Sequence, residues 1–492
     1  MATAEDLAKT ESAASLAGKM RRKELSPVEV MQAAIARIEA HNPKVNALVI
    51  LHLDEAMKAA RAAEAAIMRG DALGPLHGVP TAMKDCFDFK PGWVTTFGGV
   101  RGLANYVARR ACGFVERMEK AGAIVVGKTN SPVFGFRGTC DNYLFGPSRN
   151  PFDLSKNTGG SSGGGAGAVA AGLLPICEGT DGGGSIRIPA SWCGVYGYKP
   201  AFGRMPLIGG DDAFGGVTPF IFEGAIARTV EDAALAMTAL AGYDSRDLFS
   251  AEGTVDFLGA TRASIAGKRI AYTADYGIFP VEREVKAVVG AALKAFEEAG
   301  AHVEEVDIGI RRPQRELSDL WCRFIAPKHV AALDGFKREG LDLEGEHRGD
   351  FPPEFWAWDE VGRTLTVREF LADQAMRSEV VGALRGVLDR YDYLVSPTLA
   401  CVAVDNAADG NTLGPAEIEG EPIDRLIGWC MTYLINFIGY PAATVPAGLN
   451  AAGLPVGMQI VGRRYADADV IAASAAFERI RPWADTYRRC RL

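Results

Sequence analysis

Two glycine-dense loops, separated by a short apolar run, constrain this chain more than any other feature of its sequence. The first loop carries Ser161 and Ser162, the second carries Ser185, and the run between them covers residues 166–176. Glycine costs backbone entropy, so a compact chain concentrates it where the backbone approaches another group closely or takes a positive φ. Apolar residues and Trp192 follow the second serine, and a solvated Gly/Ser linker does not need them. We therefore expect the two loops to form a site.

The second loop has the composition of an oxyanion-binding loop. Consecutive glycines allow several backbone N–H groups to converge on one point, where they stabilise an anion or a developing oxyanion. Three glycines precede Ser185, which places this serine to attack a carbonyl whose oxygen the N–H groups receive. The pattern therefore favours acyl transfer through a serine.

A nucleophilic serine needs a base, and Lys84 is the best candidate in the sequence. None of the six histidines lies in a motif comparable with the serine loops. Lys84 follows an apolar run in the segment GVPTAMKD at 78–85, and removal of a lysine from water favours its neutral amine, which can accept a proton. Taken alone, Lys84 beside Asp85 also fits an ordinary surface ion pair. The presence of the two serine loops, which need a base, favours the role of Lys84 as that base.

Together these segments resemble the signature of the amidase signature family. Its pattern is a lysine motif, then GGSSGG, and then GTDxGGSIRxPAxxxGxxGxKP. This chain has TGGSSGGG at 158–165 and GTDGGGSIRIPASWCGVYGYKP at 179–200, and Ser161 and Ser185 have the spacing of the family. Weaker matches at other positions extend the resemblance over nearly the whole chain, and the pattern is closest to that of stand-alone bacterial amidases and aryl acylamidases.

The resemblance implies roles for individual residues and implies no metal or cofactor. Ser185 resembles the nucleophile, Ser161 the serine that follows a cis peptide bond and relays a proton, and Lys84 the neutral lysine that acts as base. Further residues are expected in the oxyanion hole (Gly182, Gly183, Gly184 and Ser185), as supports of the loop (Asp181 and Arg187) and in contact with substrate (Thr158, Gly159, Gly160, Trp429 and Tyr433).

The expected fold is a single large α/β/α domain, with a central mixed β-sheet covered by helices on both faces. Residues 1–70 would form an N-terminal helical segment packed on the core, and residues 71–492 would form the amidase signature domain. The apolar run at 123–127 is typical of a buried strand, and residues 224–242 predict an amphipathic helix.

Residues 313–392 form a mostly helical and unusually aromatic stretch that the signature does not require. In the family, the corresponding region varies and borders the substrate entrance, so specificity is expected to reside there. The alternative is a helical cap whose aromatic side chains belong to the core.

Charge and composition exclude several classes of function. The formal net charge of −8 argues against a general surface for nucleic acid or anionic membranes. No apolar run approaches 18 residues, and the N-terminus lacks the apolar segment of a secretory signal. The nine scattered cysteines lack a C-x-x-C pair, which indicates reduced thiols in a cytoplasmic protein. We expect a small-molecule amide as substrate, no nucleic-acid or membrane partner, and leave a homodimer open.

Two short patterns suggest nucleotide binding, but neither has the required context. GAGAVA at 165–170 matches G-x-G-x-x-A, but no strand directly precedes it. GAIVVGKT at 122–129 has the Walker spacing, but its four middle residues are apolar and themselves predict a strand. A catalytically inactive binding protein is disfavoured as well, because Lys84, Ser161 and Ser185 are all present.

A different function stays open within the same family. One component of the glutamyl-tRNA(Gln) amidotransferase, its amidase-like subunit, has this signature and releases ammonia from glutamine within a multi-subunit complex. In those proteins an acidic residue that holds the glutamine amino group lies seven positions before the asparagine of an N-x-x-G-x-P segment. Here that asparagine is Asn436, and Trp429 occupies the earlier position. Tryptophan cannot form a salt bridge with an ammonium but can flank an apolar group, so the sequence favours hydrolysis of apolar aryl or alkyl amides, anilides or carbamates (urethanes).

Overall fold

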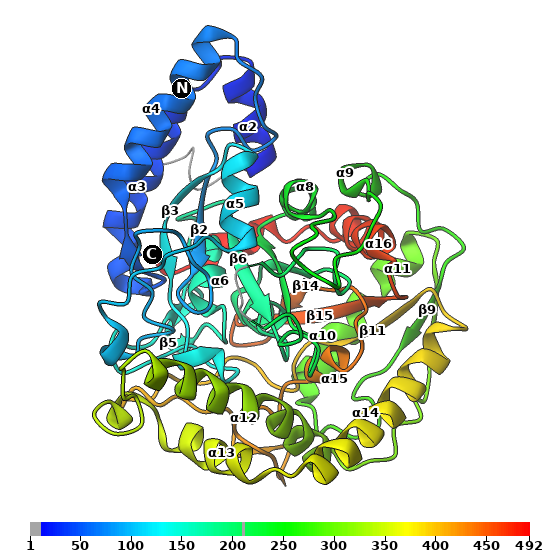
Figure 1. Ribbon diagram of the computed structural model, residues 1–492. Helices are drawn as coiled ribbons and strands as arrows, with labels where there is room; N and C mark the ends of the chain where they lie inside the picture. Colours follow the sequence, from blue (N-terminus) through cyan, green and yellow to red (C-terminus); the bar gives the residue numbers. More distant parts are fainter. Residues whose placement is uncertain (1–10, 209–211) are drawn as a thin grey trace.

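A mixed sheet of eleven strands runs through the centre of the described part of the chain. The computed structural model describes residues 11–208 and 212–492. The strand order is β1-β3-β2-β6-β8-β7-β14-β15-β11-β9-β10 (Figure 1). The strands are β1 Leu48–Leu51, β2 Pro80–Lys84, β3 Ile124–Thr129, β6 Ile176–Asp181, β7 Tyr196–Lys199, β8 Phe222–Ala227, β9 Arg269–Tyr272, β10 His302–Glu305, β11 Tyr393–Pro397, β14 Ala442–Leu449 and β15 Pro455–Gly462. Two small two-stranded sheets lie outside it, formed by β4 Arg149–Asn150 with β5 Asp153–Asn157 and by β12 Glu417–Ile418 with β13 Glu421–Pro422.

Helices cover both faces of this sheet, as expected for the α/β/α class. Strand β8 illustrates how both faces of the sheet become buried, because alternate side chains of a strand point to opposite faces. Ile226 belongs to the apolar cluster that includes α6, whereas Ala225 and Ala227 belong to the cluster that includes α8. The helices are α2 Ala13–Arg21, α3 Pro27–Val45, α4 Leu53–Arg69, α5 Gly113–Lys120, α6 Gly163–Ala170, α7 Arg187–Cys193, α8 Val230–Leu240, α9 Phe257–Ala260, α10 Arg283–Ala292, α11 Lys294–Glu298, α12 Gln314–Arg338, α13 Pro353–Thr364, α14 Val367–Leu388, α15 Tyr433–Asn436 and α16 Asp467–Ile480.

The N-terminal segment is helical and also contributes to the central sheet. Ser26 and Glu29 form a capping box at the start of α3, and Gly70 follows the end of α4 in a left-handed conformation. Between these helices, β1 pairs antiparallel with β3 at the edge of the sheet. Residues 1–10, which belong to the expected segment 1–70, lie outside the described residues.

The prediction of one helix over residues 224–242 is wrong for its first part. Residues Phe222–Ala227 form β8, which lies between β6 and β7, and the helix α8 begins only at Val230. A Cβ at Gly224 would overlap the carbonyl oxygen of Tyr198 on the neighbouring strand. The small residues that suggested a helix therefore serve close packing within the sheet.

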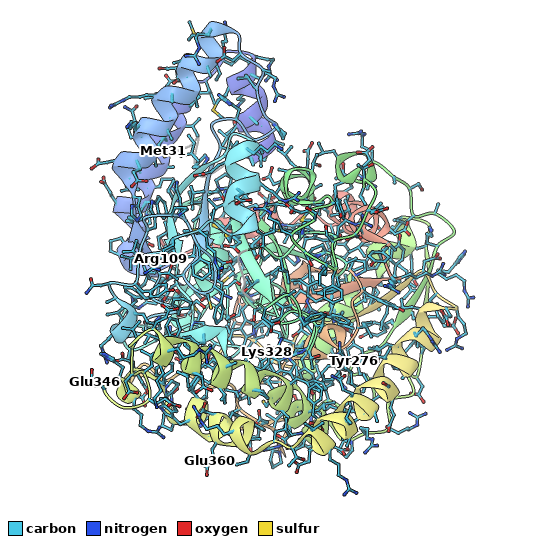
Figure 2. All side chains as sticks on the ribbon, in the orientation of Figure 1. Met31, Arg109, Tyr276, Lys328, Glu346 and Glu360 are labelled. Carbon is cyan, nitrogen blue, oxygen red and sulfur yellow. The ribbon has the colours of Figure 1, made fainter. Side chains whose placement is uncertain are left out.

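The aromatic stretch folds into α12, α13 and α14, which follow one another along one side of the molecule (Figure 1). Phe324, Phe351 and Phe355 are buried in the core, as the helical-cap alternative anticipated. Lys328 of α12, labelled in Figure 2, donates a hydrogen bond to the carbonyl oxygen of Gly215. Burial lowers the pKa of Lys328 to about 7. The helices therefore hold the loop that leads into β8.

Among the residues that the structure describes, none of the helices combines the length and the apolar character that crossing a bilayer requires.

Candidate active site

The structure brings Lys84 and Ser161 into direct contact. Lys84 is the last residue of β2, and Ser161 lies two residues before α6. The Nζ of Lys84 donates to the Oγ of Ser161 and to the Oγ1 of Thr180, at 2.7 Å each. Lys84 and Ser161 are only 1% and 2% exposed. The amine is therefore held against a serine hydroxyl with almost no access to bulk water, as a lysine base requires.

The backbone fixes the position of Ser161. The peptide bond between Gly160 and Ser161 is cis. The N–H of Gly160 donates to the carbonyl oxygen of Gly138 at 2.6 Å, and the N–H of Gly159 donates to Asn157 at 2.9 Å. The first glycine loop is thus anchored directly before the serine.

Ser185 lies in the loop after β6 and is the most accessible of the three side chains, with intermediate exposure. Its carbonyl oxygen accepts the N–H of Ser162 at 3.2 Å, which joins the two glycine loops. The described contacts include no hydrogen bond between the hydroxyls of Ser161 and Ser185. In substrate-free sites such catalytic hydrogen bonds are often long, and they tighten when substrate binds.

One member of the expected oxyanion hole has another partner. The N–H of Gly184 donates to Oδ1 of Asp181 at 2.8 Å, so the assignment of this group to the oxyanion hole is wrong. Within the described residues, the N–H groups of Gly182, Gly183 and Ser185 have no hydrogen-bond acceptor. These three donors are therefore available to an oxyanion.

A buried ion pair supports the second loop. Arg187 donates two hydrogen bonds to the carboxylate of Asp181, at 2.9 and 3.0 Å, and both side chains are fully buried. Arg187 also donates to Asn436 and Gln459, and Asn436 donates to Asp181 at 2.9 Å. Burial alone would raise the pKa of Asp181, but the charge and hydrogen bonds of Arg187 lower it to about 2.

Sequence reasoning missed two residues that hold the carbonyl groups of this loop. The indole N–H of Trp321, on α12, donates to the carbonyl oxygen of Gly182 at 2.9 Å. The hydroxyl of Thr432 donates to the carbonyl oxygen of Gly183 at 2.7 Å. The peptide unit is planar, so the contact of Trp321 with the Gly182 carbonyl also fixes the direction of the N–H of Gly183, one of the three free donors. Neither residue belongs to the signature, so no local pattern indicates these contacts.

The same two side chains explain why the loop needs glycine. A Cβ on Gly183 would lie 2.7 Å from the ring of Trp321, and a Cβ on Gly184 would overlap Thr432. Gly184 also has a φ of +122°, which a residue with a side chain rarely adopts.

The structure corrects the expectation that Trp429 and Tyr433 line an open apolar pocket. Both side chains are completely buried. Trp429 stacks on Trp192 with ring centroids 4.7 Å apart and donates to the carbonyl oxygen of Arg425. Thr158, Gly159 and Gly160, the other expected substrate contacts, are buried in the first glycine loop.

A different aromatic group lies beside the serine loops. A Cβ on Gly135 would be 3.2 Å from the hydroxyl of Ser161, so this backbone passes directly over the serine. The preceding residue, Phe134, contacts Phe97 and the 45% exposed Phe87. Aromatic rings therefore connect the protein surface with the neighbourhood of Ser161.

Comparison with known proteins assigns this arrangement to a family. The Amidase family model matches residues 29–471. The chain belongs to the amidase family. Amidases hydrolyse C–N bonds of linear amides, and the acylamidases among its relatives support this reaction class for the chain, which is therefore an amide hydrolase.

Relatives of this amidase include proteins with different biochemical roles. An acylamidase of Rhodococcus erythropolis is 37% identical over 476 residues, which cover 96% of both chains. The crystal structure of a bacterial aryl acylamidase of the amidase signature family is 49% identical, has a TM-score of 0.95, and covers 97% of this chain and 98% of the other. The amidase-like subunit of the glutamyl-tRNA(Gln) amidotransferase from Moorella thermoacetica is 35% identical over 487 residues, covering 95% of this amidase and 96% of its relative.

Replacing Trp321 by phenylalanine is expected to lower kcat about tenfold with little change in KM. The substitution removes the N–H that holds the Gly182 carbonyl but keeps an aromatic ring on Gly183. Steady-state kinetics of amide hydrolysis would measure the effect.

Trp358→Phe is the matched control, because Trp358 is a partly buried tryptophan on α13. If kcat falls equally in both variants, or if only KM changes in Trp321→Phe, then Trp321 does not position the loop for catalysis.

Proposed function

We propose that this amidase is an acylamidase that cleaves apolar aryl or alkyl amides, including anilides, through an acyl-enzyme on Ser185. The observation that carries the proposal is the buried Lys84–Ser161 contact, joined to the Ser185 loop and bordered by aromatic side chains. Its relatives named as acylamidases support the same substrate class.

In the proposed reaction, Ser185 Oγ attacks the carbonyl carbon of the amide. Its proton moves to Ser161 Oγ, whose own proton moves to the neutral amine of Lys84. The N–H groups of Gly182, Gly183 and Ser185 stabilise the oxyanion of the tetrahedral intermediate. Collapse of the intermediate breaks the C–N bond, and the proton returns through Ser161 to the departing amine.

Water completes the reaction by the same route. It loses a proton through Ser161 to Lys84 as it attacks the acyl-enzyme, and the carboxylic acid leaves as Ser185 regains its proton. In both halves of the cycle the proton thus moves along one route, between Ser185 or water, Ser161 and Lys84. The hydrogen bond between Lys84 and Ser161 keeps the distance of this transfer short.

The aromatic side chains favour an apolar substrate. Gly135 lies against the hydroxyl of Ser161, and Phe134, the residue before it, packs against the partly exposed Phe87. The ring of Trp321 lies against Gly183 in the Ser185 loop. An aryl or alkyl group gains stabilisation from such surfaces, whereas the charged ends of glutamine need paired groups. The carboxylate of Asp181, in the Ser185 loop, is already occupied by Arg187 and Asn436.

The purified chain alone is expected to release 4-nitroaniline from 4-nitroacetanilide, with kcat/KM at least on the order of 100-fold above that for glutamine. Absorbance of 4-nitroaniline and a coupled assay for ammonia would measure the two reactions, with Ser185→Ala as the blank.

The related amidotransferase defines the opposite outcome. If the chain releases ammonia from glutamine but leaves the anilide intact, the proposed substrate class is wrong while the serine chemistry stands. If neither substrate reacts, even with longer acyl groups, the assignment as a self-sufficient acylamidase is wrong.

A further inference from the structure

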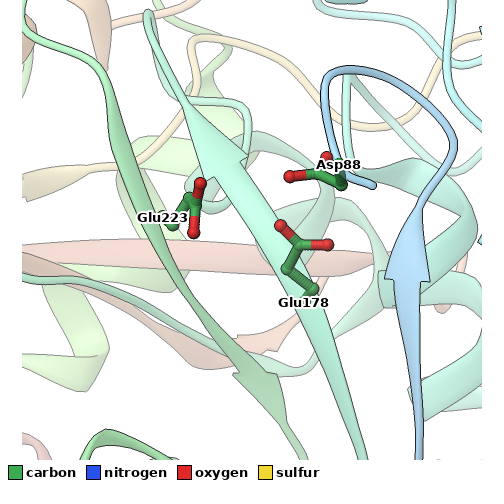
Figure 3. Close-up of side chains that lie close together, drawn as sticks. All are labelled: Asp88, Glu178 and Glu223. Atoms are coloured by element: carbon green, nitrogen blue, oxygen red, sulfur yellow. The ribbon is translucent and has the colours of Figure 1, made fainter. Parts of the chain in front are cut away.

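Three carboxyl groups meet in the interior beside the catalytic lysine. Asp88 follows β2, Glu178 lies in β6 and Glu223 lies in β8, the strand on the other side of β6. One carboxylate oxygen from each residue lies within 4.8 Å of the other two (Figure 3). The three residues are 1%, 0% and 7% exposed. Three neighbouring segments of the sheet therefore place acidic side chains in one buried space.

Each of these residues leaves an oxygen without a partner. Oδ2 of Asp88, Oε1 of Glu178 and Oε2 of Glu223 are buried and, when the carboxyl groups are ionised, receive no hydrogen bond from the described residues. An unpaired carboxylate is strongly disfavoured in the interior, and three adjacent ones also repel each other. Burial raises the pKa of all three groups, and the charge of Asp88 raises those of Glu178 and Glu223 further. A hydrogen bond with Glu178 and the charges of Lys84 and Lys128 act to lower the pKa of Asp88, which nevertheless stays raised. The two lysines therefore leave part of the negative charge unbalanced, and a bound cation or shared protons would offset it.

The ligand set fits a calcium ion better than a magnesium ion. Ca²⁺ takes six to eight oxygen ligands, including carboxylates, in a flexible geometry that a buried group of protein side chains can supply. Mg²⁺ keeps several waters and needs a near-ideal octahedral arrangement, which a closed interior site does not favour. Oxygen-only ligands also disfavour zinc and copper, which prefer nitrogen and sulfur.

We propose that Asp88, Glu178 and Glu223 form a buried binding site for one calcium ion. The ion connects β2, β6 and β8 through their side chains. Oε2 of Glu178 already accepts the backbone N–H of Lys84 at 2.8 Å, so the ion fixes the position of the lysine through Glu178.

Metal content and thermal unfolding of the whole protein test this site without an activity assay. The purified chain, desalted into metal-free buffer, is expected to retain about one calcium per chain by inductively coupled plasma mass spectrometry. After treatment with EDTA, addition of millimolar Ca²⁺ is expected to raise Tm by about 2 °C or more, and Mg²⁺ or Mn²⁺ by less.

Variants then locate the ion. In Glu223→Gln and Asp88→Asn the rise in Tm with Ca²⁺ should disappear, while Glu417→Gln, which changes an exposed carboxylate on β12, should keep it. Equal rises in all variants would place the ion elsewhere and overturn the proposal. A wild-type chain that retains no calcium and has the same Tm in EDTA and in each cation would overturn it as well. In that case protons shared among Asp88, Glu178 and Glu223, rather than a metal ion, balance their charge.

Discussion

The Ser185→Ala variant is expected to lose amide hydrolysis by about 10⁴-fold or more in kcat, because it removes the hydroxyl that is proposed to attack the carbonyl and carry the acyl group. Ser185 is partly exposed and makes no side-chain hydrogen bond in the described contacts, so its hydroxyl contributes little to stability. The substitution should therefore leave Tm nearly unchanged. Anilide hydrolysis and thermal unfolding, measured on the same preparation, separate the two effects.

Ser378→Ala is the matched control, since Ser378 is exposed on α14 and donates only to a carbonyl oxygen of its own helix. This variant should keep full activity. Mass spectrometry of wild-type protein mixed with substrate should detect an acyl group on the peptide that contains Ser185. Residual activity in Ser185→Ala above about one per cent of wild type, or acylation of another residue, would contradict the assignment of the nucleophile.

Asp181→Asn is expected to lower the free energy of unfolding by about 3–5 kcal/mol, because it leaves the guanidinium of Arg187 buried without its counter-charge. Asp181 also accepts the N–H groups of Gly184 and Ile186, so the Ser185 loop should lose order and activity should fall. Urea unfolding would measure the stability. Asp307→Asn, which breaks the exposed pair with Arg311, is the control and should have no measurable effect.

The contribution of Asp181 should depend on pH in a defined direction. Its pKa is about 2 in the folded chain and close to 3.9 when unfolded, so the stabilisation is complete above about pH 4 and is lost as the pH falls toward 2. Between about pH 5 and pH 3 the difference in unfolding free energy between wild type and Asp181→Asn should shrink by about 1 kcal/mol. A constant difference over this range would show that Asp181 does not carry its charge into the folded state.

Local sequence patterns were sufficient for the reaction class and for most elements of the fold. The signature itself contains Ser161, Ser185, Asp181 and Arg187, and in the structure Asp181 and Arg187 pair within its second loop. Strands such as β3 and β15 are apolar runs that are visible in the chain, and the cap of α3 is encoded within four residues. Interactions of this kind can be predicted from the sequence because the residues that form them are close together in the chain.

The error at β8 has a physical origin. Small residues around Gly224 fit a helix and a tightly packed strand equally well, so periodicity alone did not decide between them. The choice depends on β6 and β7, which leave a place for a strand between them.

Contacts between distant segments could not be read from any local pattern. Trp321 and Thr432 reach the Ser185 loop from α12 and from the segment before α15, and Trp429 lies in the core although its position suggested a pocket. Asp88, Glu178 and Glu223 share no motif, and they meet because β2, β6 and β8 are neighbours in the sheet. Motifs and their spacing thus indicate the groups that we propose to carry the chemistry. The packing of the sheet and helices determines which atoms hold those groups in place, because such contacts depend on strand order and burial rather than on distance along the chain.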